Sequence, residues 1–187
     1  MSNEVARLFL DEAVKTFRSN KALADKALAQ LKDEEFLVTI DEESNSVGVI
    51  IKHMTGNMFS RWTDFLTTDG EKPDRNRDME FVLTPETTRE ELLVRWEEGW
   101  RCVFNAVESL QTEDVEKIVL IRGEEHTVMK AVIRQISHYA QHIGQIVFLA
   151  KHFRSAEWKT LSIPRNRSVE FNAALSEQFK QSDEGKP

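Results

Sequence analysis

The sequence predicts an all-α protein, built as a four-helix bundle with long loops and one small β-hairpin before the last bundle helix. Apolar residues recur at three- and four-residue spacing along four segments of similar length, which is the pattern of amphipathic helices. Only 4 prolines occur among the 187 residues, and all of them fall outside these segments, as helix-breaking residues should. Four matched apolar stripes bury one another most simply in a bundle.

The start of each helix has its own support. Ser46 is a good N-cap for the second segment, and Thr88 forms the capping-box pattern with Glu91 at the start of the third. The predicted helices cover approximately residues 4–31, 46–66, 88–110 and 127–153. Helices of this length measure roughly 30–42 Å. The tryptophans at helical spacing are expected in the core, namely Trp62, Trp96 and Trp100.

The connections between these helices are unequal. Residues 32–45 and 67–87 are too long for tight turns, so a crossover connection or functional loops are expected there. Residues 117–128 contain a β-rich run followed by Arg122 and Gly123. That pattern predicts a small hairpin directly before the fourth helix.

A single domain is expected over residues 1–175. It ends with an irregular stretch after Phe153 and a short helical piece near residues 169–175. The last residues, 176–187, have no apolar pattern beyond Phe179 and are expected to fray.

The charge balance and the cysteine content exclude several classes of protein. With 25 basic and 32 acidic residues the formal net charge is −7, which disfavours binding to a nucleic-acid backbone. No apolar run approaches the roughly 20 residues of a membrane helix, and the acidic start does not match a signal peptide. Cys102 is the only cysteine, so no intrachain disulfide forms. We therefore expect a cytoplasmic protein with neither nucleic-acid nor membrane partners.

Three histidines form the candidate metal site. His138 and His142 are spaced i and i+4 on the fourth helix, so their rings project from one face, one turn apart. His53 lies on a flank of the second helix, beside its apolar stripe. Two such flanks can meet at a groove of a bundle, where three neutral imidazoles would form an open site for a divalent metal. Imidazole ligands suit zinc, nickel, iron or copper better than magnesium or calcium.

Interpretations without a metal site also remain open for this histidine pattern. A pair of histidines one turn apart also occurs on solvated helix faces. Tyr139 stands where a zinc protease of the HExxH type carries its general base, which disfavours that class. Asn57, one turn after His53, and Gln145, one turn after His142, are candidates for binding substrate or a metal-bound water. Exposed polar positions explain both equally well.

Two arginine pairs lie in connecting segments and are candidates for binding an anionic substrate. Arg75 and Arg77 belong to a densely charged loop, and Arg165 and Arg167 follow a proline after the fourth helix. Salt bridges to surface acids are the alternative for both pairs.

Three glycines lie beyond the first turn of predicted helices, where each costs about 1 kcal/mol relative to alanine. They are Gly56, Gly99 and Gly144. Close helix packing is the favoured reason, and room for a ligand near the histidines is the alternative.

Several stretches together resemble the DinB/YfiT-like superfamily of bacterial four-helix metalloproteins. The resemblance rests on NSVGVIIKHMTGN (45–57) and HYAQHIGQI (138–146), in that order. Residues 60–81 and 158–168 are similar to an uncharacterised branch of this superfamily. The resemblance covers approximately residues 4–175.

This resemblance implies a four-helix fold and a metal triad that falls on His53, His138 and His142. It further implies a divalent ion such as zinc or nickel, and it makes a homodimer the expected assembly. Some members are thiol-dependent S-transferases or isomerases that use a low-molecular-weight thiol, and others are called hydrolases.

Three functions therefore stay open. The first is a metalloenzyme that uses the three-histidine site for thiol-dependent S-transfer to a small-molecule substrate. The second is a metal-dependent hydrolase. The third is a non-catalytic metal-binding protein, structural or dimeric, in which the ion joins two helices. An open coordination position favours the enzymes, and a fourth protein ligand would favour the structural role.

Overall fold

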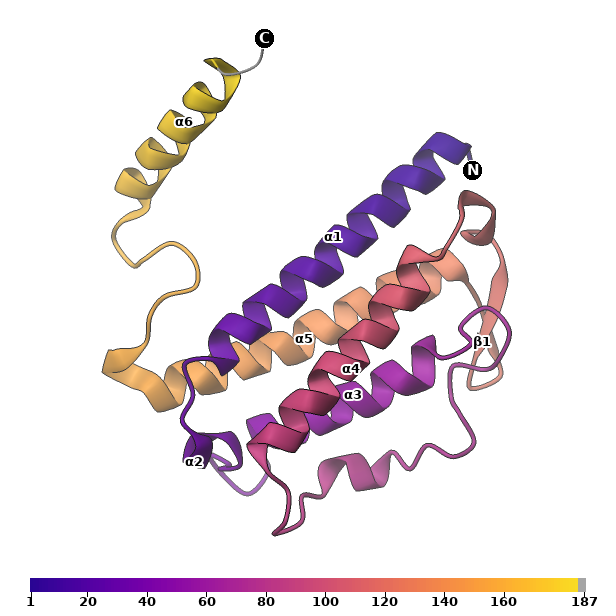
Figure 1. Cartoon of the computed structure of the whole chain (residues 1–187), viewed down its shortest axis with the longest axis horizontal. Helices are drawn as coiled ribbons and strands as arrows, with labels where there is room; N and C mark the ends of the chain where they lie inside the picture. The colour runs from indigo at the N-terminus through magenta and orange to yellow at the C-terminus, as the bar shows by residue number, and fades with distance from the viewer. Residues whose placement is uncertain (185–187) are drawn as a thin grey trace.

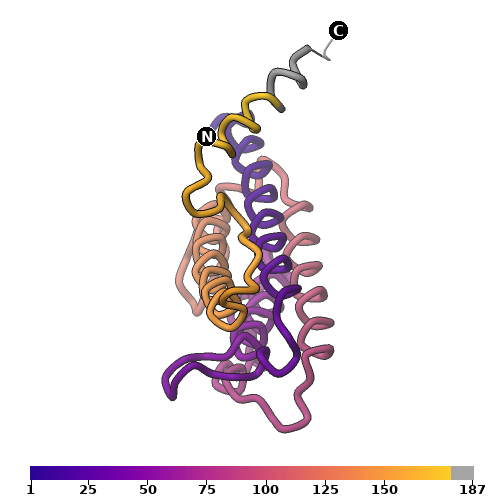
Figure 2. The backbone as a smooth tube through the Cα atoms, turned by 90° about the vertical axis from the view of Figure 1, so that its left-hand side faces the viewer, coloured from indigo at the N-terminus to yellow at the C-terminus, as the bar shows by residue number. Residues whose placement is uncertain are grey.

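Four long helices lie side by side and form the body of the protein (Figures 1 and 2). The structure, a computed structural model, describes the backbone of residues 1–184 and the side chains of residues 1–177. The bundle helices are α1 (Asn3–Leu28), α3 (Val47–Trp62), α4 (Arg89–Glu108) and α5 (Val128–Arg154). The most extensive packing joins α3 to α4 and α1 to α5. The predicted four-helix bundle is confirmed.

Short elements fill the connections. They are α2 (Asp33–Phe36), the 3-10 helices η1 (Asp78–Phe81), η2 (Thr112–Asp114) and η3 (Ser155–Glu157), and the strands β1 (Ile118–Ile121) and β2 (Glu124–Thr127). A longer helix, α6 (Ser168–Glu184), follows the last bundle helix. The strands pair antiparallel, with Ile121 opposite Glu124. Arg122 and Gly123 connect them with positive φ angles of 57° and 75°, the backbone geometry of a two-residue hairpin turn. The predicted hairpin before α5 is therefore confirmed.

Local capping fixes the start of α3 and α4 as the sequence predicted. The Ser46 hydroxyl accepts the backbone N–H of Val49, and Thr88 and Glu91 form a reciprocal capping box. The end of α3 differs from the prediction, because the helix stops at Trp62 instead of near residue 66. Asp64 takes a φ of 49°, a left-handed conformation that an α-helix cannot continue through.

An aromatic cluster in the core takes one ring from each bundle helix. Phe17, Trp62, Trp100 and Tyr139 are buried, and Phe17 meets Trp62 edge to face with ring centroids 5.7 Å apart. The Trp62 indole N–H donates a hydrogen bond to the Tyr139 hydroxyl at 3.0 Å, so that burying these two polar groups leaves both partnered. Burial of such side chains stabilises the fold by about 1.5–3 kcal/mol each. The core assignment of the tryptophans is confirmed.

The C-terminal segment departs from its predicted conformation. Helix α6 continues through residues 176–184, which the sequence predicted to fray, and residues 185–187 lie outside the described part of the chain. Glutamate, glutamine and lysine are good helix formers, so this stretch needs no apolar stripe to be helical. Side chains of residues 168–177 are exposed, and α6 stands apart from the bundle in Figure 1.

Over residues 1–184, no helix combines the length and the apolar character that crossing a membrane requires.

Candidate metal centre

Helices α3 and α5 bring three histidine side chains together. Each of His53, His138 and His142 offers a ring nitrogen, and these three atoms lie within 4.8 Å of one another. The Nε2 atoms of His138 and His142 are 3.1 Å apart. Two ligands of a tetrahedral zinc ion stand about 3.3 Å apart when the Zn–N bonds have their usual length. The cluster could therefore hold a metal ion with little movement of this pair.

A buried hydrogen-bond network fixes α3 against α5 beside the histidines. Gln135, which is 1% exposed, donates from its side-chain amide to Asn57 Oδ1 at 2.7 Å. The Tyr139 hydroxyl donates to the same oxygen at 3.2 Å. Asn57, a predicted substrate-binding residue, thus accepts two hydrogen bonds from α5. The position of His53 relative to the α5 pair follows from this network, because it lies one helical turn from Asn57.

His53 is oriented by a carboxylate from the connection between α3 and α4. Its Nδ1 lies 2.9 Å from Oε2 of Glu80, in the 3-10 helix η1. Burial alone would raise the pKa of Glu80, but hydrogen bonds from His53 and Arg75 outweigh burial and hold that pKa below its usual range. An ionised carboxylate only accepts hydrogen bonds, so His53 Nδ1 carries a hydrogen and Nε2 is the ring nitrogen left to bind a metal.

The two histidines of α5 differ in their support. His142 Nδ1 lies 2.8 Å from the side-chain oxygen of Gln145, which also assigns the hydrogen to Nδ1 and the lone pair to Nε2. His138 Nδ1 is buried and has no hydrogen-bond partner among the described residues. The predicted polar residue Gln145 therefore contacts the ring of a candidate ligand.

Burial keeps the α5 pair neutral. Burial first, then the neighbouring His142 and His53, lower the pKa of His138 to about 3. Burial also lowers the pKa of His142, against the hydrogen bond to Gln145, which raises it. Neutral imidazole is the form that binds metals, so at neutral pH no proton has to leave these two rings before an ion enters.

The connection between α3 and α4 also covers His53 with an aromatic ring. Phe81 lies against it, with ring centroids 4.9 Å apart. The guanidinium group of Arg77 in turn lies over the Phe81 ring, 5.1 Å from its centroid. Residues from one loop thus contact His53 both at its Nδ1 edge and on its ring.

The four predicted arginines occupy different places. Arg75 is 5% exposed and binds Glu80 through two parallel hydrogen bonds, of 2.8 and 2.9 Å. Arg165 and Arg167 are exposed, and Arg167 pairs with Glu170. Their segment leaves the end of α5 and runs towards α6 (Figure 1). The structure thus brings Arg75 to the histidines through Glu80, and it does not bring the second pair there.

Two residues near the cluster were missed by sequence reasoning. Glu80 is one acid in a loop of many charges, and no local spacing connects it to His53, which lies 27 residues earlier. Arg134 stands one turn before His138 on α5, and its positive charge helps to lower the pKa of that ring. Its i, i+4 spacing from His138 was a signal available in the sequence.

Close contacts explain Gly56 and Gly99, and no contact explains Gly144. A Cβ on Gly99 would lie 2.9 Å from the Met58 sulfur, so close packing of α4 on α3 explains this glycine, as predicted. A Cβ on Gly56 would lie 2.3 Å from Glu80 Oε1, so this glycine makes room for the carboxylate behind His53. Gly144 has open space around its Cβ position.

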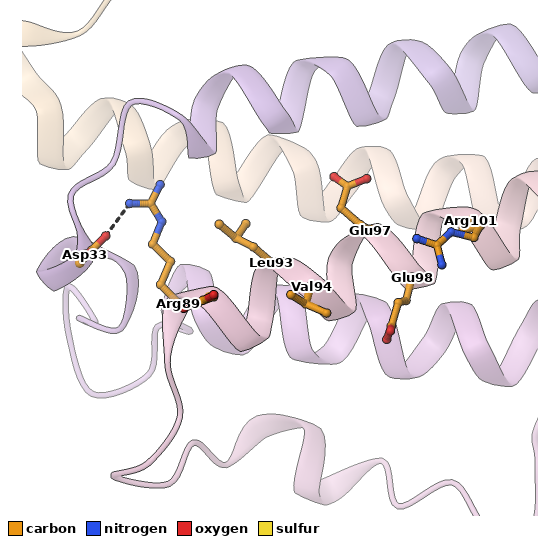
Figure 3. Close-up of a pocket in the computed structure, with 8 residues that line it drawn as sticks. Asp33, Arg89, Leu93, Val94, Glu97, Glu98 and Arg101 are labelled. Atoms are coloured by element: carbon orange, nitrogen blue, oxygen red, sulfur yellow. Dashed lines mark hydrogen bonds and ion pairs between the residues drawn. The ribbon is translucent and has the colours of Figure 1, made fainter.

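Two of the hollows on the described surface lie on or beside α4, and neither is lined by the three histidines. One of about 600 Å³ follows the outer face of α4, where Arg89 pairs with Asp33 at 2.6 Å (Figure 3). A second, of about 1110 Å³, lies between α3, α4 and the 72–80 stretch, and Gly56 and Glu80 are among the residues that line it. Both are lined by charges of both signs, which points to no particular ligand.

A family model matches most of the chain. The model of the family DUF1572, described as a protein of unknown function, matches residues 4–167. The match therefore includes all four bundle helices, the hairpin and the three histidines, and it ends just before α6. None of the curated proteins compared with the chain matches it.

Proposed function

Because the chain belongs to DUF1572, a family of unknown function, we propose its function from the three-histidine cluster. The protein is a metalloenzyme in which His53, His138 and His142 bind one divalent transition metal through their Nε2 atoms. The observation that carries the proposal is the convergence of one ring nitrogen from each histidine within 4.8 Å, with Nδ1 of His53 and Nδ1 of His142 each in hydrogen-bond contact with another side chain.

Zinc or nickel is the ion that suits this set best. Neutral imidazole nitrogens are borderline ligands that favour such ions, whereas magnesium and calcium require oxygen ligands. Among the side chains of residues 1–177, no cysteine or carboxylate joins the three histidines as a fourth ligand. Three protein ligands with an open position are typical of catalytic metal sites, and this supports an enzyme over a structural clip.

The reaction we propose is thiol-dependent S-transfer. A divalent ion with three neutral ligands keeps its full positive charge and supplies Lewis-acid activation of a bound thiol or water. Burial keeps His138 neutral, and the hydrogen bonds on His53 and His142 orient these two rings. The sulfur of a low-molecular-weight thiol would lose its proton and form a bond to the electrophilic atom of a small molecule, whose leaving group would depart with its bonding electron pair and take up a proton. Hydrolysis by an activated water is the second candidate, because the same open position accepts it.

Two further proposals concern the family context and the substrate. The helical bundle and the three-histidine cluster support placing the chain in the DinB/YfiT-like superfamily, whose resemblance also supports a homodimer. Arg134, whose charge acts on His138, is a better placed cation for an anionic substrate than Arg75, which is buried against Glu80.

Metal stoichiometry tests the site directly. Untagged wild-type protein should contain about one equivalent of zinc or nickel by elemental analysis, and His138→Ala should contain far less, because two imidazoles hold the ion weakly. His152→Ala removes an exposed histidine near the end of the same helix and is the matched control. Equal metal content in wild type and His138→Ala would contradict the site.

A screen of thiols with electrophiles, run beside ester and amide substrates, tests the reaction on the same samples. His142→Ala or removal of the metal with a chelator should abolish activity and leave the helical circular dichroism intact, since the aromatic core does not depend on the ion. Collapse of the helical signal on metal removal would instead favour the structural role.

A further inference from the structure

The carboxylate behind His53 has a more specific role than neutralising a buried arginine. We propose that Glu80, held by Arg75, is a positioning residue for the metal: it fixes the hydrogen of His53 on Nδ1 and strengthens Nε2 as a ligand. This inference rests on the proposed function, since it assigns the residue that prepares one of the three ligands.

Helix α3 provides the space that the Glu80 side chain occupies. Its side chain is 8% exposed, and its Oε1 lies so close to the backbone of Gly56 that any side chain there would collide with it. Gly56 is one turn after His53, so the same face of α3 carries the ring and receives the carboxylate. A glycine inside a helix is unfavourable by about 1 kcal/mol relative to alanine. At position 56 the glycine allows the Glu80 carboxylate to approach the backbone of α3.

Arg75 holds the carboxylate at both oxygens. Its Nε donates to Oε1 at 2.8 Å and its Nη2 donates to Oε2 at 2.9 Å, which is the two-point geometry of an arginine–carboxylate pair. The same guanidinium group also contacts Glu71, which in turn accepts from the buried Arg61. The charges alternate along this chain, so a negative Glu80 is retained beside His53 without an unpaired buried ion.

A carboxylate in this position changes the ligand itself. A metal-binding histidine that donates its other N–H to a carboxylate has a fixed tautomer, a fixed ring orientation and a more basic ligating nitrogen. Oε2 of Glu80 is 2.9 Å from Nδ1 of His53, and Nε2 at the other edge of the ring is left for the ion. Loss of such a partner lowers metal affinity by about 10–100-fold.

The second histidine provides an internal comparison. His142 makes the same kind of hydrogen bond, of 2.8 Å, but to the neutral amide of Gln145, which is exposed to solvent. A neutral, solvated acceptor orients the ring and adds less basicity than a buried carboxylate. We therefore expect Gln145→Ala to affect metal binding less than Glu80→Gln does.

The first experiment reads the tautomer of His53 in metal-free protein. Long-range ¹H–¹⁵N correlation spectra show which ring nitrogen carries the hydrogen, with His53→Ala used to assign the signal. The wild type should show His53 with its hydrogen on Nδ1. In Glu80→Gln the form with the hydrogen on Nε2 should increase, because an amide can donate to Nδ1 as well as accept from it.

The second experiment measures zinc affinity by competition with a chromogenic chelator. Glu80→Gln should bind zinc about 10–100-fold more weakly than the wild type, and the visible spectrum of its Co²⁺ form should shift. Glu86→Gln makes the same chemical change at an exposed position of the same connection and should match the wild type. If Glu80→Gln loses the wild-type circular dichroism, the double variant Arg75→Met/Glu80→Gln replaces it, because it leaves no unpaired buried guanidinium.

The outcomes separate this inference from the proposed function. A wild type that binds no zinc overturns both. A wild type that binds zinc, with Glu80→Gln within about threefold of its affinity, overturns the role of Glu80 and leaves the metal site standing. An unchanged His53 tautomer in Glu80→Gln overturns it as well, even with weakened zinc binding, since the loss would then come from a merely structural effect.

Discussion

Two charged segments of this chain contain arginine pairs, and the fold buries an arginine of one pair but leaves the other pair exposed. The connection between α3 and α4 places Arg75 in a buried ion pair behind His53, whereas the segment after α5 leaves Arg165 and Arg167 exposed. Each pair belongs to an Arg-Asn-Arg triplet shortly after a proline, Pro73 in one segment and Pro164 in the other, so the local sequence of the pair did not decide the outcome. What differs is whether the bundle offers the segment buried partners.

The connection between α3 and α4 is fixed to the bundle at several points. The Asp69 carboxylate accepts the backbone N–H groups of Arg122 and Gly123, at 2.8 and 2.7 Å, and so joins the loop to the hairpin turn. The Gly70 N–H donates to the carbonyl of Leu120 at 2.8 Å. These anchors hold the loop where Glu80 can reach His53. By contrast, the ion pair of Arg167 in the other segment is to a neighbour three residues away and exposed to water.

The largest effect that distinguishes the two segments should come from removing Arg75. Arg75→Met leaves the Glu80 carboxylate buried with only His53 as its partner, and breaking a buried ion pair in this way costs about 3 kcal/mol of unfolding free energy. Urea denaturation measures it. The double variant Arg165→Met/Arg167→Met should remain within about 0.5 kcal/mol of the wild type, because both side chains are exposed. Equal losses for the two variants would remove the distinction.

Two glycine substitutions test how firmly the connection between α3 and α4 holds Glu80. They should change the free energy of unfolding with opposite signs. Gly56→Ala should destabilise by about 1 kcal/mol, because the new Cβ meets a carboxylate that Arg75 and His53 hold in place, and this strain exceeds the gain in helix propensity. Gly144→Ala meets open space and should stabilise by up to about 1 kcal/mol. Urea midpoints on both variants report the signs. A stabilising Gly56→Ala would show that the Glu80 carboxylate is free to move.

The smallest effect concerns the pH dependence of the loop anchor. Burial would raise the pKa of Asp69, but hydrogen bonds from the backbone N–H groups of Glu71, Gly123 and Arg122 outweigh it and lower that pKa. A depressed folded-state pKa contributes stability above the unfolded value of about 4, and this contribution is lost as the pH falls through the folded value.

Asp69→Asn should therefore be less stable than the wild type at pH 7, and the difference should shrink below about pH 4. Thermal denaturation of both proteins from pH 7 to pH 3 measures it. A difference in stability that is independent of pH over this range would contradict the anchoring role of the carboxylate.

Local patterns in the sequence predicted most of the fold correctly. Ser46 and Thr88 start their helices as predicted, and Arg122-Gly123 makes the hairpin turn, because caps and turns depend on residues within a few positions of one another. The end of α3 was wrong by four residues, since the apolar stripe continues to Phe65 although the backbone already turns at Asp64. The helical stretch after residue 175 was missed because it has no apolar stripe to reveal it.

The candidate site was likewise predicted from the sequence only where residues close together in the chain determine it. The i, i+4 spacing by itself determined that His138 and His142 share a face, because a helix repeats every 3.6 residues. Only the tertiary structure decided which flank of α3 these two histidines meet. It also decided that Glu80 and Arg75 lie behind His53. Those contacts depend on the path of a 21-residue connection (residues 67–87), and a loop has no periodicity from which its path can be derived.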